Sequence, residues 1–265
     1  MYLKGKEKHL FSVLLVVFLL FGLTSCTLID KLKARNYLNK GVKAYKDKDY
    51  ESAVDNFKKA IELDPDLLRA YEYLAIAYAS EFVPNLPTER NLKKAKIAIE
   101  TFKKVLEFEP NNITAIQYLA NLNQAIGDYD AAKKWYRKRL EVQPDNPEPL
   151  YGIGVIDWKL VNDETGNNGE MYKDLSPEEK AQKREKLEPL IDEAIQALKK
   201  ALEINPDYAD AMSYLNLCYR KKALFAEDEE MKKKYTQEAD RLAIKAIELK
   251  KKLQREQEEK RKKIF

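Results

Sequence analysis

The side chains that most often serve as nucleophiles, general bases and zinc ligands are nearly absent from this chain of 265 residues. It contains one histidine, His9, and two cysteines, Cys26 and Cys218. Ser-His-Asp catalysis, Cys-His catalysis and the histidine-bearing zinc sites all require a histidine among their residues. His9 lies in a short N-terminal segment that we expect to be removed, so the mature chain would hold none. The sequence therefore predicts neither these forms of catalysis nor these zinc sites.

Carboxylates are abundant, but their pattern points to no particular reaction. Charged residues make up 35% of the chain, and most of them would simply solvate helix faces. No GxSxG, phosphate-binding glycine loop or SxxK motif occurs in the sequence. The polar turn at 162–170 offers oxygen donors for calcium, but counted from Asp163 the glycine required at position six is at position seven. We predict no metal and no cofactor, and keep an enzyme that works through carboxylates as a third alternative.

Cys26 closes an N-terminal segment with the features of a secretory signal peptide. Three basic residues precede an apolar stretch from Leu10 to Leu23: Lys4, Lys6 and Lys8. This stretch has 14 residues, whereas a membrane-spanning helix needs about 20. A basic start, a short apolar run and small residues before a cleavage site are typical of an export signal. We therefore predict that residues 1–25 form a cleaved signal peptide.

The ending Leu23-Thr24-Ser25-Cys26 is similar to the lipobox of bacterial lipoproteins. The resemblance implies cleavage before Cys26, a diacylglycerol on its sulfur, and a lipidated N-terminus and tether at 26–33. Two or three acyl chains on one residue would make membrane attachment permanent. Thr27 in place of aspartate implies the outer membrane, with the protein facing the periplasm of a bacterial envelope. The alternative is an ordinary export signal with an incidental cysteine.

The rest of the composition limits the partners. Without residues 1–25 the chain has 45 basic and 43 acidic residues, so it lacks the strong positive field that nucleic-acid binding needs. Cys218 then has no second cysteine to pair with, and we interpret it as a small buried side chain. The sequence predicts protein partners and a membrane anchor, and no nucleic acid.

Four similar phrases, each closed by a proline, give the chain its period. The four segments are Glu62–Pro65, Glu107–Pro110, Glu141–Pro144 and Glu203–Pro206. Their prolines are 45, 34 and 62 residues apart, which is a unit of 34 residues interrupted by insertions of 11 and 28. A 34-residue period indicates an array of two-helix hairpins.

Residues inside this period resemble the tetratricopeptide repeat. Gly41 and Gly154 occupy the small eighth position, Ala53 and Ala132 the small twentieth, and aromatic residues such as Phe57 the twenty-fourth. Small residues let the two helices of a hairpin approach closely, and large residues fill the gaps beside them. Arg139 departs from this pattern at a small position, so its hairpin or the next must be spaced differently. Lys251 replaces the closing proline of the last repeat.

The resemblance implies an all-α protein, a right-handed α-solenoid of about five hairpins with two to three insertions and a long C-terminal capping helix. We expect the solenoid over 34–251 and a charged helical extension over 252–265. The repeats are expected at 34–67, 68–112, 113–146, 147–207 and 208–251. Residues 80–92 and 159–187 carry the insertions, and Ser176–Glu179 predicts a capping box at a helix start.

In this family the first helix of each hairpin lines a concave groove that binds a peptide or a helix. The resemblance places eight residues there: Leu38, Val42, Tyr45, Tyr73, Tyr118, Tyr151, Trp158 and Tyr214. Some of them could instead pack between neighbouring hairpins. Members that clasp chaperone tails use lysine, asparagine and arginine at positions held here by Leu38, Val42, Tyr73, Thr114 and Tyr118, so this chain is not such a co-chaperone.

The helix expected from about Glu227 ends in two basic clusters and most simply caps the array. Its tip could alternatively contact anionic lipids or an acidic partner. We predict a non-enzymatic, membrane-anchored scaffold of the bacterial envelope that binds a segment of another envelope protein. The second alternative is an assembly factor of the kind that pilots a secretion or pilus system or helps insert outer-membrane barrels.

Overall fold

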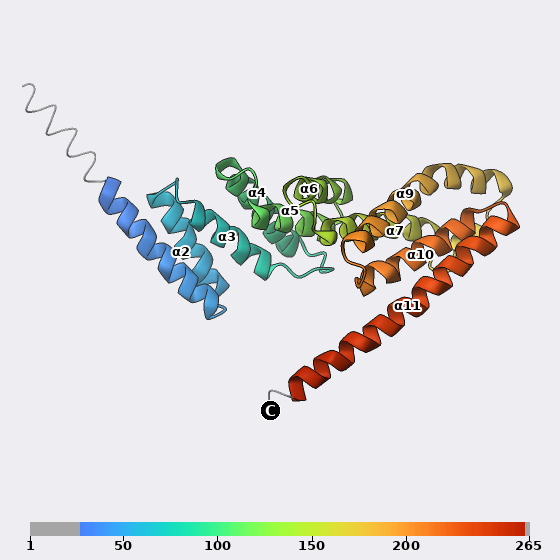
Figure 1. Ribbon diagram of the computed structural model, residues 1–265. Helices are drawn as coiled ribbons and strands as arrows, with labels where there is room; N and C mark the ends of the chain where they lie inside the picture. The colour runs from blue at the N-terminus through green and yellow to red at the C-terminus, as the bar shows by residue number, and fades with distance from the viewer. Residues whose placement is uncertain (1–26, 263–265) are drawn as a thin grey trace, which may run out of the picture. The chain divides into compact units, whose positions relative to one another are not determined.

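The computed structural model describes residues 27–262, and over that range the chain forms helices and no strand (Figure 1). The first helix covers residues 27–46. It is followed by α2 (Tyr50–Leu63), α3 (Leu68–Glu81), α4 (Glu89–Phe108), α5 (Ile113–Ala125), α6 (Tyr129–Val142), α7 (Pro147–Thr165), α8 (Glu170–Lys173), α9 (Pro177–Ile204), α10 (Ala209–Phe225) and α11 (Glu229–Lys262). The predicted signal peptide and Cys26 lie outside the described residues.

The four periodic prolines mark helix ends. Each proline stands two residues after the last helical residue of α2, α4, α6 or α9. Proline disfavours helical backbone at the residue before it, so each helix must stop there and the chain must turn. The 34-residue period is thus a period of helix endings.

Polar side chains begin most of the helices. Asp49, Asn112 and Asp128 each accept a hydrogen bond from a free backbone N–H in the first turn of α2, α5 and α6. The predicted capping box is confirmed at α9, where Ser176 and Glu179 each accept from the other's backbone N–H. Such a cap contributes about 1 kcal/mol, so the start of α9 after the long insertion is well defined.

The chain divides into two compact units, and each is described by itself. Unit 1 ends at Ile126 and unit 2 begins at Gly127, inside the segment predicted as the third repeat. In unit 1, α3 packs against both α2 and α4, and α4 packs against α5. A β-carbon added to Gly41 would lie 2.4 Å from the ring of Phe57, so the small eighth position does allow the close approach that the pattern predicts. Phe57 and Phe102 are fully buried.

The insertion at 80–92 forms a turn that is held by side-chain hydrogen bonds, and it also lengthens α4. Asn91 is buried and holds the turn with three bonds: its amide oxygen accepts from Val83 N–H at 2.9 Å, and its amide nitrogen donates to the carbonyls of Val83 at 2.7 Å and Leu86 at 2.8 Å. Phe82, which we considered a possible contact for a partner, is buried, whereas Leu86 is exposed.

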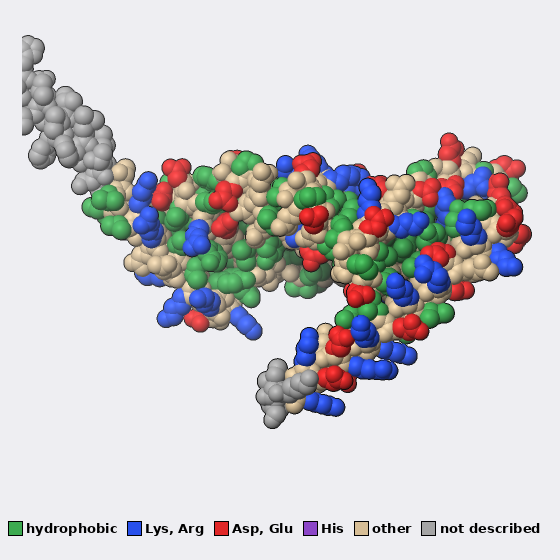
Figure 2. All heavy atoms as spheres, viewed as in Figure 1, with side chains coloured by type: hydrophobic (Ala, Val, Ile, Leu, Met, Phe, Trp, Pro, Cys, Tyr) green, Lys and Arg blue, Asp and Glu red, His purple; other side chains and the backbone are tan. Residues whose placement is uncertain are grey.

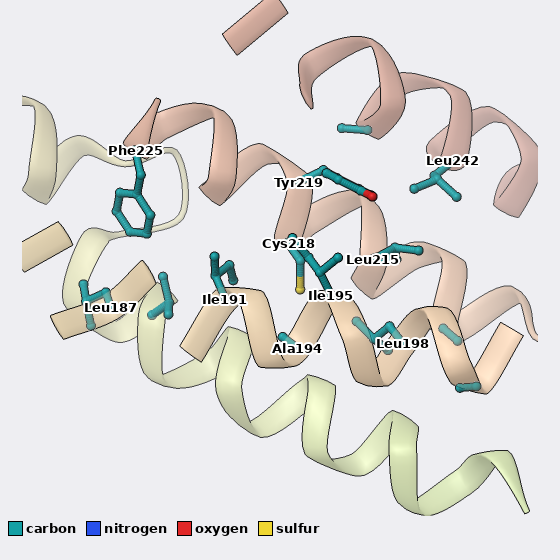
Figure 3. Close-up of a cluster of buried hydrophobic side chains, with 14 of the residues drawn as sticks. Leu187, Ile191, Ala194, Ile195, Leu198, Leu215, Cys218, Tyr219, Phe225 and Leu242 are labelled. Atoms are coloured by element: carbon teal, nitrogen blue, oxygen red, sulfur yellow. The ribbon is translucent and has the colours of Figure 1, made fainter. Parts of the chain in front are cut away.

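In unit 2, α7 packs on α9 and α10 packs on both α9 and α11. Figure 3 shows the apolar core between these helices, with Leu187, Ile191 and Leu198 spaced along α9 and Leu215 coming from α10. Cys218 lies in this core, and burial strongly raises the pKa of its thiol, as expected for a structural rather than a reactive cysteine.

The segments at both ends of the predicted solenoid are helical. The tether expected over 26–33 is helical from residue 27, because the first helix begins before the repeat does. At the C-terminal end, α11 continues through the expected 251/252 boundary into the charged extension, as expected for one long helix from about Glu227, and Figure 2 shows side chains of both charges along its C-terminal part. Arg139 is accommodated in α6 by extending its guanidinium toward Gln143 and Glu148.

From 27 to 262, no helix is both long and apolar enough to cross a membrane.

Candidate protein-binding surface

Two of the predicted groove residues in unit 1 are stacked on the core. Tyr73 of α3 lies on Phe57 of α2 with ring centroids 5.7 Å apart, and Tyr118 of α5 lies on Phe102 of α4 at 4.7 Å. Both pairs are close to parallel and join successive hairpins. The two tyrosines are only half-buried, so each supports the packing of a hairpin and still offers one ring face.

The other predicted residues of unit 1 differ in exposure. Tyr45 is half-buried, and its hydroxyl forms a 3.0 Å hydrogen bond with Ser80. Val42 is also half-buried. Leu38 is only 8% exposed, so it belongs to the core of unit 1 and offers a partner little surface. Leu38 and Val42 are four residues apart and share one face of the first helix, so the repeat register alone did not distinguish how deeply each is buried.

In unit 2 the predicted residues do come together. Tyr151 and Trp158 of α7 and Tyr214 of α10 form one group with Tyr208, which the sequence reasoning missed; we call these four residues the aromatic cluster. Tyr214 lies 5.6 Å from Tyr151 and 5.2 Å from Trp158, both edge to face, and Tyr151 lies 5.1 Å from Tyr208. The signal for Tyr208 was its place in the turn after Pro206, just before α10.

The hydroxyl groups of the aromatic cluster are suited to donate hydrogen bonds. Burial raises the pKa of Tyr151 strongly, and the neighbouring ring and carboxylate of Tyr214 and Asp210 raise it further. Burial also raises the pKa of Tyr208. Both phenols therefore stay protonated at neutral pH. The indole N–H of Trp158 is buried and finds no acceptor among residues 27–262. The cluster combines aromatic faces with polar donors, the combination that is enriched in protein-binding surfaces.

A network of charges around the buried Asp157 joins α6, α7 and α9. The ammonium of Lys133 in α6 is 2.6 Å from Asp157 of α7 and 2.8 Å from Glu193 of α9, and Arg137 also reaches Glu193 at 2.6 Å. Asp157 is fully buried, and its second oxygen has no hydrogen-bond partner in the part of the chain that the structure describes. Burial raises the pKa of Asp157 to about 6, against the lowering effect of Lys133. This network ties three helices of unit 2 together beside the aromatic cluster.

The ammonium group of Lys221 binds to the polar turn after α7. The buried ammonium of Lys221 in α10 donates to the hydroxyl of Thr165 at 3.0 Å and to the backbone carbonyls of Gly166 and Asn167. Backbone carbonyl oxygens are among the groups that bind calcium, and here two of them accept from Lys221. No cluster of three or more acidic, histidine or cysteine side chains suited to a metal occurs between residues 27 and 262. Through these hydrogen bonds, Lys221 of α10 holds the turn that follows α7.

Unit 1 also has a hollow of about 530 Å³ between α2, α3 and α4. Its apolar floor includes Ile61, Tyr71, Leu74 and Ile97, and four lysines stand at its rim: Lys58, Lys93, Lys96 and Lys104. It lies apart from the predicted groove residues, none of which lines it.

Comparison with known proteins supports the repeat pattern. Family models described as tetratricopeptide repeat match residues 34–67, 115–146 and 190–208. No curated protein matches the sequence at a significant level.

Solved structures give the same fold. A crystal structure of MamA is 20% identical, with a TM-score of 0.57 over 81% of this chain and 96% of that one. MamA from Desulfovibrio magneticus RS-1 is 18% identical, with a TM-score of 0.57 over 83% and 96%. YrrB, described as a TPR protein with an unusual peptide-binding site, is 19% identical, with a TM-score of 0.51 over 81% and 90%. At these identities the likeness concerns the fold, and it confirms the predicted all-α fold of the tetratricopeptide type.

Proposed function

We propose that this chain, which carries tetratricopeptide repeats, is a non-enzymatic scaffold that binds an extended or helical segment of another protein. The observation that carries the proposal is the aromatic cluster, in which α7, α10 and the turn before α10 bring four half-buried rings into contact. Rings held in this way offer a large contact area at small entropy cost, because their rotamers are already restricted.

Two further points support this reading. The described residues contain no histidine, and Cys218 is buried, so catalysis by histidine or by a reactive cysteine is not available there. YrrB, which has a similar fold, is described as having a peptide-binding site. Peptide binding is therefore a known use of this architecture, although the residues that perform it here must be found on this chain.

The proposal predicts that replacing Tyr151 and Tyr214 together by alanine will strongly weaken partner binding. The protein beginning at residue 27 retains every buried side chain of the described structure and can capture partners from solubilised bacterial envelopes. Loss of two central rings from a binding surface costs at least about tenfold in affinity. The amount of the specific partner captured, quantified by mass spectrometry, should fall accordingly.

A matched control is Tyr235→Ala in α11, because Tyr235 is also half-buried and stacked, 6.0 Å from Tyr219, outside the cluster. Circular dichroism should first establish that both variants are folded. Equal capture of the same protein by the wild type and the Tyr151/Tyr214 variant would exclude the aromatic cluster as the binding surface. Loss of capture with Tyr235→Ala as well would indicate a general effect on folding.

We further propose that the scaffold is attached to a bacterial envelope membrane through lipid on Cys26, in the outer membrane facing the periplasm. Support comes from the sequence before Cys26, since the N-terminal segment has the charge pattern and length of an export signal ending in a lipobox-like tetrapeptide. The partner would then be another envelope protein. A scaffold held at the membrane meets such partners at a high local concentration.

Lipidation predicts that cells grown with radiolabelled palmitate will label the wild-type protein and will not label Cys26→Ser. The matched control is Cys218→Ala, which removes the second cysteine and should leave the label unchanged, because Cys218 is buried in the core. Labelling is measured on the immunoprecipitated protein after electrophoresis. An unlabelled wild-type protein would mean that residues 1–25 are an ordinary export signal and that Cys26 is incidental.

A further inference from the structure

The first helix begins with an exposed apolar patch. Leu28, Ile29 and Leu32 are 63%, 51% and 59% exposed, and they fall within five residues of one another. Isolated exposed aliphatic side chains are common on protein surfaces, but three on adjacent positions of one helix form a continuous patch. We call these three residues the N-terminal apolar face. Leu28 and Leu32 are one helical turn apart, and Ile29 lies beside them.

This face is turned away from the core of unit 1. The buried side of the same helix is formed by Ala34, Leu38 and Gly41, which follow the helical spacing of four and three. Ala34 comes six residues after Leu28, which corresponds to roughly 240° of rotation about the helix axis. The hairpin packing therefore leaves the N-terminal apolar face uncovered, and the repeat does not need it.

The chain immediately before the face points to what covers it. Residue 26 is the proposed lipid-bearing cysteine, and the apolar stretch from Leu10 to Leu23 lies only a few residues earlier in the sequence. A lipid on Cys26 would hold Leu28 within about one helical turn of the bilayer surface. The same placement follows if the apolar stretch itself stays in the membrane.

The charges on the same turns fit an anionic surface. Lys31, Lys33 and Arg35 lie within a turn of Leu32; Lys33 reaches Asp30 at 3.5 Å, and all three basic side chains are exposed. Basic residues that flank an apolar helix face are the usual pattern of segments that lie in the interface of a membrane with anionic lipids.

We propose that the N-terminal apolar face inserts into the lipid interface beside the anchor, with Lys31, Lys33 and Arg35 at the headgroups. The inference rests on the proposed placement of residue 26 at a membrane. It adds that the first helix lies along the bilayer surface at its start, so that the anchor is not a free tether. The first hairpin is then presented in a fixed orientation, because its first helix is continuous from residue 27 to residue 46.

An artificial anchor tests this face independently of lipidation. The protein beginning at residue 27, with a histidine tag before it, is attached to vesicles of phosphatidylcholine and phosphatidylglycerol that contain a nickel-chelating lipid. Single cysteines at Leu28, Ile29 or Leu32 carry the environment-sensitive dye NBD. Matched control positions on the same turns are Lys31 and Lys33. Cys218 remains in place, since it is buried and its thiol pKa is raised.

We expect NBD at Ile29 and Leu32 to be quenched by nitroxide-labelled acyl chains about threefold more than NBD at Lys31 and Lys33, because an inserted helix buries one face by about 5–10 Å. A dye at Asn36, one turn beyond Leu32, should lose its quenching when Leu28, Ile29 and Leu32 are changed to serine. These three side chains are exposed, so the variant is expected to fold.

Equal quenching at all positions, or none at any, would overturn the proposal. A blue shift at Leu28 and Ile29 that appears without vesicles and grows with protein concentration would overturn it too, and would assign the face to a second copy of the chain. Because the tag replaces the lipid, these results are independent of the palmitate labelling. If the NBD dyes are not quenched but Cys26 is labelled by palmitate, the lipid anchor stands. Only the proposed contact of the first helix with the bilayer is then excluded.

Discussion

Replacing Lys133 by methionine is expected to lower the free energy of unfolding of unit 2 by about 3–5 kcal/mol at pH 8. The ammonium of Lys133 is the partner of the fully buried Asp157, and the two atoms are 2.6 Å apart. Without it, a carboxylate that already has one unpaired oxygen among the described residues would lose its only ion pair. Methionine preserves most of the apolar stem, so the loss is mainly electrostatic.

The effect should depend on pH in a direction set by Asp157. Burial raises its pKa in the folded protein to about 6, above the ordinary value of 3.8. A raised pKa stabilises the folded state fully below pH 3.8, and this contribution is lost as the pH rises through about 6. In Lys133→Met the pKa of Asp157 rises further, because the lowering effect of the ammonium is gone. The difference between variant and wild type should therefore be smaller at pH 5 and largest near pH 8.

Glu193 does not titrate in the folded protein between pH 5 and pH 8. Burial raises its pKa, but the hydrogen bonds from Lys133 and Arg137 outweigh burial and lower it below the ordinary value of 4.5. A lowered pKa gives stability that is present above pH 4.5 and is lost only as the pH falls below it. The protein beginning at residue 27 also lacks histidine, the side chain that ordinarily titrates between pH 5 and 8.

Tryptophan fluorescence during urea unfolding at pH 5 and pH 8 measures the effect. The chain has two tryptophans, Trp135 and Trp158, and both belong to unit 2. Lys138→Met is the matched control, because Lys138 forms only a surface ion pair with Glu141 at 3.0 Å and should cost less than about 1 kcal/mol at either pH. The double variant Lys133→Met/Asp157→Leu should recover most of the loss. A cost for Lys133→Met that is the same at both pH values would contradict a role for the buried carboxylate.

The sequence predicted the features that repeat. Gly41 meets Phe57 and Gly154 meets Leu198, so both small eighth positions allow the close approach expected inside a hairpin. The prolines end the helices that they were expected to end. Each of these features depends on residues at a fixed spacing along one unit, and such spacing can be counted in a single sequence.

The specific polar contacts could not be predicted. Lys133 meets Asp157 and Glu193 at sequence separations of 24 and 60, and Lys221 meets the turn after α7 at a separation of 54 to 56. In a chain that is 35% charged, no spacing distinguishes a buried lysine from a solvated one. The predicted groove residues show the same limit: register places Tyr73 on α3 and Tyr118 on α5, but only tertiary packing determines how much of each ring a core phenylalanine covers.

A close approach of α7 to α9 in the core of unit 2 leads to a second large effect: the effect of Gly154→Ala on stability should change sign when Leu198 is replaced. A β-carbon at Gly154 of α7 would lie 2.5 Å from Cγ of Leu198 in α9, and Leu198 is fully buried. Leu198→Ala alone is expected to cost about 2–5 kcal/mol, because it leaves a cavity. Gly154→Ala alone overpacks the contact at a cost of about 1–3 kcal/mol, offset by about 1 kcal/mol of better helix propensity. The net result is a moderate loss of stability.

In the Leu198→Ala background the clashing atoms are absent, so only the helix propensity remains. Gly154→Ala should then stabilise unit 2 by about 0.5–1 kcal/mol, and the coupling between the two positions should be about 2 kcal/mol. Gly127→Ala is the matched control: nothing lies within 4 Å of its added β-carbon, and its φ of +84° gives the same backbone strain in both backgrounds. Trp fluorescence in urea measures all four proteins of the cycle. A loss of stability for Gly154→Ala that is unchanged by Leu198→Ala would mean that contacts other than the one with Leu198 determine the residue at this position.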